Sequence, residues 1–233
     1  MEILHFINGI NPRVLEESIK LAVSEAPAMV HQHIDHDSPL LPLAEAEVEV
    51  LLGQSLRMVG ADARERIDGH LTELKVGLIA VIDDEGETPL LAGFLQYKPR
   101  IFAEGMASIG YAAVAKPYRH QGVFTRMLDE LKSHYPILGL DCPLELVSMY
   151  EKLGFKVDNA QGAHVGMYLG ALGGKNWHMD QASLERNAVY LRAKERVRDQ
   201  LGKGTREAYA KRDADTQNRV EEVNGLLAQK GLK

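Results

Sequence analysis

The sequence predicts a mixed α/β fold followed by a helical extension at the carboxyl end. Three observations predict it. Helical periodicity dominates the first 70 residues, strand-length apolar runs alternate with one-sided helices over residues 74–172, and polar helix formers fill residues 173–233. We therefore expect two parts, residues 1–172 and residues 173–233.

Two helices and a hairpin are expected first. The segments "PRVLEESIKLAVSEA" and "LAEAEVEVLLGQSLRMV" carry apolar residues at helical spacing, and the prolines of "PAMVHQHIDHDSPLLP" indicate a loop between them. The period then changes. "LKVGLIAVIDDEGETPLLAGFLQYK" consists of two apolar runs about an acidic turn, which is typical of a β-hairpin.

Strands and helices then alternate. "FTRMLDELKSHY" is a helix with apolar or aromatic side chains at 124, 127, 128 and 131 on one face. The helix "LELVSMYEKLGF" is stopped by Gly154. The three segments that read as strands are "MASIGYAAVA", "PILGL" and "AHVGMYLGAL".

Composition and charge limit the compartment and the partners. The single Cys142 excludes an intramolecular disulfide and fits a reducing compartment. No apolar stretch approaches the roughly 20 residues that span a bilayer, so we expect a cytoplasmic protein without membrane contact. Residues 173–233 carry a net charge of +4 and residues 1–172 a net charge of −10. An acidic body favours a cationic or amine substrate over nucleic acid.

The stretch "AVAKPYRHQGVFTRML", residues 113–128, breaks a strand pattern before a helix begins. Consecutive backbone N–H groups at a helix start, with the positive end of the helix dipole behind them, can bind a pyrophosphate. A glycine there keeps side chains out of the way. Alternatively, Gly122 only ends the strand.

Two segments carry a family resemblance. "VAKPYRHQGVF" and "MYEKLGF" together resemble the two core motifs of the GNAT superfamily of N-acetyltransferases, Q/R-x-x-G-x-G/A and LYxKxGF. The order and spacing of the elements over residues 74–172 are similar too. The resemblance implies a GNAT-type central mixed sheet of about six or seven strands flanked by helices.

The resemblance implies acetyl-CoA as co-substrate. Arg119 and Gly122 stand at the motif positions, and Phe124 stands where Gly or Ala is usual. We expect the Phe124 ring to turn into the core, because the helix needs an apolar side chain there. The other residues implied to contact the cofactor are Val114 and Ala115, facing pantetheine, and His120, Gln121, Val123 and Thr125 around the phosphates.

The resemblance also implies acetyl transfer to an amine by direct attack, as in an acyltransferase. Tyr150 matches the tyrosine that protonates the departing thiolate in many members, although its ring could simply pack under the cofactor. Pro143 and Leu146 replace the usual Asn and Ala, which puts a polar contact to the cofactor in doubt. The general base is left open. Asp141 could face the acceptor, but we expect it to cap the following helix.

The loop "HQHIDHD" invites a metal hypothesis. Alternation places His31, His33 and Asp35 on one side of an extended segment, an arrangement that could ligate zinc. We expect contact with the acceptor instead, and no metal.

The carboxyl-terminal extension is basic. Residues 186–212 hold nine basic and three acidic side chains, but stacking aromatics are limited to Tyr190 and Tyr209. We expect these helices to pack on the body or on a second copy of the chain, as in a homo-oligomer. Two alternatives remain open. One is an acetyl-CoA-binding module with altered catalysis, and the other is an acetyltransferase whose basic tail brings it to an acceptor associated with nucleic acid.

Overall fold

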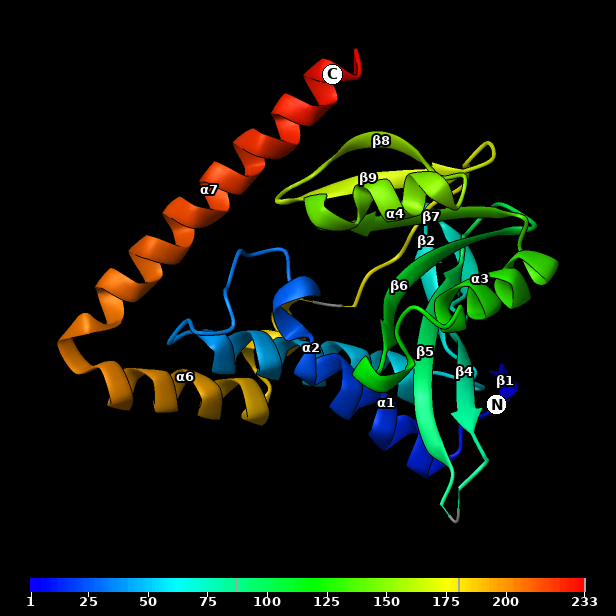
Figure 1. Ribbon diagram of the computed structural model, residues 1–233, viewed down its shortest axis with the longest axis horizontal. Helices are drawn as coiled ribbons and strands as arrows, with labels where there is room; N and C mark the ends of the chain where they lie inside the picture. The colour runs from blue at the N-terminus through cyan, green and yellow to red at the C-terminus, as the bar shows by residue number, and fades with distance from the viewer. Residues whose placement is uncertain (87, 180, 233) are drawn as a thin grey trace. The chain divides into compact units, whose positions relative to one another are not determined.

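A computed structural model describes residues 1–86, 88–179 and 181–232 and confirms the mixed α/β class (Figure 1). The chain forms two compact units. The first contains residues 1–22, 52–139 and 170–179, and the second contains residues 23–51, 140–169 and 180–233. The boundary at residue 172 stays a prediction, because it was drawn from sequence pattern and not from packing.

Seven strands form a mixed sheet in the order β1-β4-β5-β6-β7-β9-β8, as the resemblance implies. Strands β6 and β7 run parallel, with Met106 opposite Ile137, whereas the pairs β1–β4, β4–β5, β5–β6 and β8–β9 are antiparallel. The strands of this sheet are β1 (Glu2–Phe6), β4 (Gly77–Asp83), β5 (Leu90–Pro99), β6 (Met106–Val114), β7 (Ile137–Cys142), β8 (Lys156–Gln161) and β9 (His164–Leu169).

Seven α-helices accompany the strands within the described residues, and none is long and apolar enough to cross a membrane. They are α1 (Pro12–Ser24), α2 (Leu41–Arg57), α3 (Val123–His134), α4 (Val147–Lys152), α5 (Gln181–Glu185), α6 (Ala188–Leu201) and α7 (Thr205–Gln229). The short 3₁₀ turns are η1 (Ala26–Ala28), η2 (Lys116–Tyr118), η3 (Leu144–Leu146) and η4 (Gly202–Gly204). Sequence periodicity thus located the helices that flank the sheet.

Four strands escaped sequence analysis. Strand β1 is short and partly exposed, and β8, "KVDNAQ", has no apolar run. The remaining two, β2 (Arg64–Ile67) and β3 (His70–Glu73), form a separate two-stranded ribbon of largely exposed residues. All four depend on pairing with a neighbour rather than on their own apolar pattern.

The core of the first unit lies around β4 and β5. Six of the seven residues of β4 are buried, because this strand is covered on both faces. Helix α3 packs against β4 and β5 (Figure 1). Its buried face consists of Val123, Met127, Leu128 and Leu131. The position expected for Phe124 is therefore taken by Val123, and Phe124 itself is half-buried.

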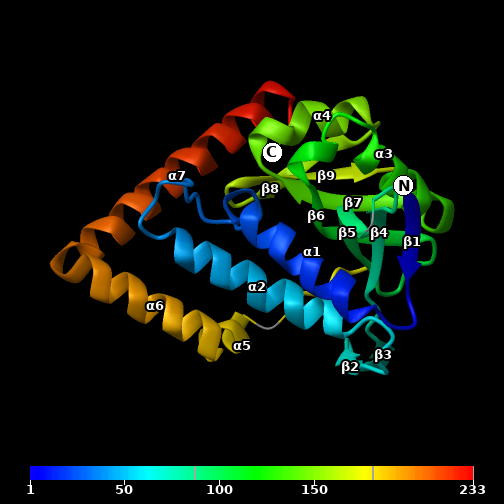
Figure 2. The same ribbon diagram turned by 60° about the horizontal axis from the view of Figure 1, so that its bottom comes forward.

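The second unit includes the carboxyl-terminal helices. Figure 2 shows α6 and α7 as two arms joined at η4. Helix α7 packs against β8 and β9, burying Val223 and Leu227. Arg219 forms an ion pair with Glu145, and Lys230 Nζ lies 2.6 Å from Glu151 Oε1. The extension is thus part of the second unit, and several of its basic groups are already paired with carboxylates.

Lys98, on β5, carries a partly buried ammonium group in the first unit. Its Nζ lies 4.4 Å from the centroid of the Trp177 ring and donates a hydrogen bond to the Trp177 carbonyl oxygen at 3.4 Å. Burial lowers the pKa of Lys98 from 10.5 to about 8, because desolvation disfavours the charged form. Below pH 8 Lys98 is charged in the folded protein, so the burial of this charge lowers the free energy of unfolding.

Lys98→Met is expected to stabilise the protein at pH 7. Between pH 8 and 10.5 the unfolded chain binds more protons at Lys98 than the folded protein does, so this group makes stability rise with pH. The free energy of unfolding of the variant lacks that rise. At pH 7 it exceeds the wild-type value by at most about 3 kcal/mol, reduced by about 1 kcal/mol for the lost cation–π contact. Urea unfolding of the variant and the wild type at pH 8 and at pH 10.5 measures the difference in unfolding free energy. Equal pH dependence in variant and wild type would contradict the assignment.

Candidate functional site

The predicted cofactor cradle begins where β6 ends at Val114. The chain continues through η2 to Gly122, which is the N-cap of α3. Gly122 has a φ of +76°, in the left-handed region that favours glycine. A Cβ at this position would meet no heavy atom of the described residues within 4 Å. The backbone N–H end of α3 is therefore not crowded at its first residue.

Hydrogen bonds from three side chains shape the loop before Gly122. Arg119 Nε donates to the Val114 carbonyl oxygen at 3.1 Å, and Gln121 Nε2 donates to the Pro117 carbonyl oxygen at 2.7 Å. The Tyr118 hydroxyl donates to Asp83 Oδ2 at 2.8 Å, which ties the loop to the acidic hairpin. Sequence analysis missed this last contact, because nothing in the pattern links the two segments.

The charge at the start of α3 suits an anion. No acidic side chain stands in its first turn. The partial positive charge of the helix N-terminus is therefore not offset by a carboxylate there. The nine residues predicted to bind the cofactor lie consecutively in this part of the first unit, except that Lys116, Pro117 and Tyr118 intervene. These residues lie close together because they are neighbours in the sequence.

Tyr150 lies on α4 in the second unit and is 7% exposed. Its ring meets the ring of Phe155 edge-on, with centroids 5.6 Å apart. Burial, followed by the nearby Cys142 and Asp141, raises the pKa of Tyr150. The phenol therefore keeps its proton at neutral pH, which is the state that a general acid requires.

Two further features of this segment bear on its chemistry. Helix α4 begins at Val147, and Pro143 is instead the N-cap of η3. Cys142 is buried, and burial raises the pKa of its thiol to about 12. Since a thiolate is the nucleophilic form, this cysteine is unreactive at neutral pH.

Asp141 contacts two histidines in the second unit. His164 Nδ1 donates a hydrogen bond to Asp141 Oδ2 at 2.9 Å, and His31 Nε2 lies 3.8 Å from the same oxygen. The two imidazole rings are tilted against each other with centroids 4.8 Å apart. The expectation of a helix cap is wrong, since Pro143 is the N-cap of the following turn and no side chain bonds there. Sequence analysis missed His164, whose only signal was a histidine within a buried strand.

A pocket of about 410 Å³ opens beside these histidines, within the second unit. One wall of the pocket comes from the loop between α1 and α2, and the expected contact of this loop with the acceptor stays a prediction. His33 and Asp35 belong to that wall but contact each other, at 3.5 Å, while His31 turns to Asp141. Residues lining the pocket include His31, Asp35, Pro143, Leu146, His164 and Arg219.

Comparison with known proteins gives one family match. Residues 55–155 match the model of the acetyltransferase (GNAT) family. The match confirms, for this segment, the resemblance carried by the two motifs. No curated protein matches the sequence.

Three of the solved structures that match this chain are the following. A GNAT-family structure from Desulfovibrio desulfuricans is 17% identical, covers 72% of this chain and 98% of its own, and has a TM-score of 0.46. An acyl-CoA N-acyltransferase from Pseudomonas aeruginosa is 12% identical, covers 73% and 100%, and has a TM-score of 0.47. An aminoglycoside 6'-N-acetyltransferase complexed with coenzyme A is 15% identical, covers 76% and 100%, and has a TM-score of 0.48.

Proposed function

We propose that the protein is an N-acetyltransferase that moves the acetyl group of acetyl-CoA to an amine. The observation that carries the proposal is Gly122, a left-handed and uncrowded glycine that starts α3 inside the segment matched by the family model. Backbone N–H groups from Gln121 to Thr125 bind the pyrophosphate, with Arg119 beside them. Val114 and Ala115, at the end of β6, pair with the pantetheine arm.

The acceptor binds in the pocket beside Asp141. Two carboxylates, those of Asp141 and Asp35, attract an ammonium group toward it. His31 Nδ1 donates to the Gln161 carbonyl oxygen at 3.3 Å, which leaves Nε2 to accept a proton from the acceptor. We assign His31 as the base on this ground.

The reaction is a direct attack. The neutral amine nitrogen bonds to the thioester carbonyl carbon, the carbon–sulfur bond breaks, and the thiolate takes a proton from Tyr150. The amine proton passes to His31 or, through water, to solvent. The enzyme forms no covalent intermediate, consistent with the protonated thiol of Cys142.

Two measurements test the function. Calorimetric titration with acetyl-CoA is expected to show saturable binding, and a thiol-release assay over polyamines, aminoglycosides, amino acids and peptides is expected to find a turned-over amine. Binding without thiol release would favour a binding module with altered catalysis. Failure to bind acetyl-CoA would contradict the proposal.

His31→Ala is expected to lower kcat/KM for the acceptor about tenfold. The loss is well below the roughly 10²–10⁴-fold contribution of an essential acid or base, because water can replace the imidazole. The affinity for acetyl-CoA stays unchanged. His70→Ala, which removes an exposed histidine on β3, is the control and keeps full activity. Equal kcat/KM in both variants would remove His31 from the mechanism.

A further inference from the structure

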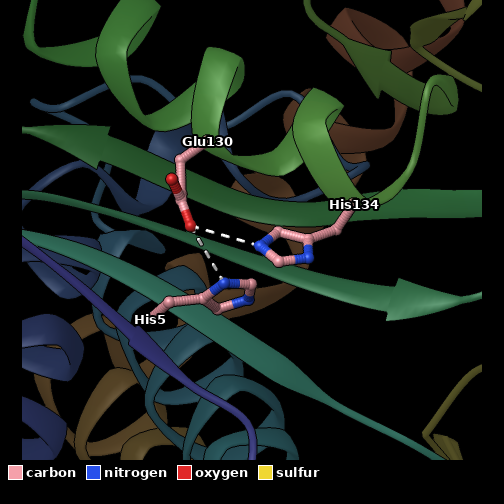
Figure 3. Close-up of side chains that lie close together, drawn as sticks. All are labelled: His5, Glu130 and His134. Atoms are coloured by element: carbon pink, nitrogen blue, oxygen red, sulfur yellow. Dashed lines mark hydrogen bonds and ion pairs between the residues drawn. The ribbon is translucent and has the colours of Figure 1, made fainter.

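A second group of histidines and a carboxylate lies in the first unit, outside the residues used above. His5 comes from β1, and Glu130 and His134 come from successive turns of α3. Figure 3 shows the two imidazoles converging on one carboxylate oxygen. Glu130 Oε1 lies 3.3 Å from His5 Nδ1 and 3.3 Å from His134 Nε2. One ligand atom from each residue lies within 4.8 Å of the others.

Both contacts to Glu130 Oε1 have hydrogen-bond geometry, and their lengths also suit the ligand spacing around a metal ion. Charge-assisted N–H···O bonds are usually about 2.7–2.9 Å long, as between His164 and Asp141, and both contacts here are longer. A tetrahedral ion with bonds of about 2.0 Å holds neighbouring ligand atoms about 3.3 Å apart. Both separations from Glu130 Oε1 match such an edge. Two imidazoles and one carboxylate are also a donor set that zinc accepts.

The surroundings of His5 prepare it as a ligand. Its Nε2 lies 2.7 Å from the hydroxyl of the buried Tyr97, so a partner on the far side of the ring fixes the imidazole. Metal-bound histidines almost always have such a partner for their second nitrogen.

An ion can reach this group. The side chains are 17% exposed at His5, 32% at Glu130 and 51% at His134, so the cluster opens toward solvent on the α3 side. The exposed His134 can adjust its ring to close the third edge of the tetrahedron. A fourth position remains for water.

We propose that His5, Glu130 and His134 form a zinc site that fastens β1 to α3. This departs from the sequence-based expectation that no metal is present. The ion links the amino-terminal strand to the helix whose first residues form the cofactor cradle. The ion takes no part in the reaction proposed above, which needs no metal.

Calorimetric titration of the metal-free full-length protein with zinc tests the site. One ion per chain is expected, and cobalt is expected to give the visible absorption bands of a four-coordinate site. His134→Ala and Glu130→Gln should abolish both signals. Tyr97→Phe, which removes only the partner of His5, should weaken zinc binding roughly 10–100-fold. Circular dichroism checks that each variant is folded.

Two controls identify the cluster that binds. His70→Ala, at an exposed histidine of the same unit, should bind zinc like the wild type. His31→Ala should do so too, whereas loss of binding in that variant would assign the ion to the cluster around Asp141 and overturn the proposal. Wild-type affinity in Glu130→Gln, or no one-to-one binding at all, would also overturn it. Acetyl-CoA binding is measured separately, so that a failure of the proposed function is recognised as such.

Discussion

Tyr150→Phe is expected to bind acetyl-CoA with unchanged affinity and to lose about 100-fold in kcat, the lower end of the range for general acid catalysis. The thiolate of coenzyme A is a moderate leaving group, so the unassisted reaction is slow rather than absent. Phenylalanine keeps the ring that meets Phe155 edge-on and removes only the hydroxyl. Urea unfolding measures any change in the stability of the fold. Steady-state kinetics with the best acceptor from the amine panel measures the effect.

The pH profile adds a second readout for Tyr150. Because burial raises its pKa above 10, the phenol stays protonated through the neutral and mildly alkaline range. The wild-type rate should therefore not fall through loss of this proton as pH rises to 10. Tyr190→Phe, at a half-buried tyrosine of α6, is the matched control and should keep full kcat. A folded Tyr150→Phe enzyme with wild-type kcat would show that the ring only packs.

Gly122→Ala is expected to weaken acetyl-CoA binding at least about tenfold, which is about 1.4 kcal/mol. A methyl group at this position points into space that is open in the structure, and it stands beside the N–H groups that we propose to bind the pyrophosphate. The positive φ adds about 1 kcal/mol of strain to the folded state. Calorimetric titration with acetyl-CoA and urea unfolding measure the two effects.

Gly69→Ala is the control that separates an effect on acetyl-CoA binding from the effect of backbone strain. Gly69 has a φ of +83°, belongs to the same unit, and its Cβ would likewise meet no heavy atom of the described residues within 4 Å. Both variants should lose about 1 kcal/mol of unfolding free energy. Only Gly122→Ala should lose cofactor affinity. Equal affinity for acetyl-CoA in the two variants would show that the turn does not bind phosphate.

The sequence predicts an element well where the element's own pattern determines it. The buried strands β4 and β5 and the one-sided helix α3 were recognised from the sequence. Their apolar residues stand in a continuous run or at helical spacing within one short segment. Strands such as β1 and β8 were missed because their hydrogen bonds to neighbours, not their apolar content, make them strands. The sequence predicted Phe124 on the buried face of α3, whereas the structure has Val123 there, because the helix begins one residue earlier than expected.

The same distinction applies to the sites. The cradle that the resemblance implies is a continuous stretch of chain, so a motif and a glycine were enough to propose it, and it stays a prediction. His164 reaches Asp141 across 23 positions of sequence, and Glu130 reaches His5 across 125. Such groups form only when the chain has folded. A single sequence holds no signal for them beyond the presence of suitable side chains.

The place of α7 bears on how acceptor choice can evolve. Arg219 of this helix lines the pocket and is held there by its ion pair with Glu145. Helix α7 thus supplies part of the wall of the proposed acceptor pocket, whereas the predicted cofactor residues belong to the other unit. Exchanging or remodelling the carboxyl-terminal helix could therefore alter the accepted amine while leaving the cofactor machinery intact. The segment that resembles an appendage in the sequence would act as an exchangeable specificity element.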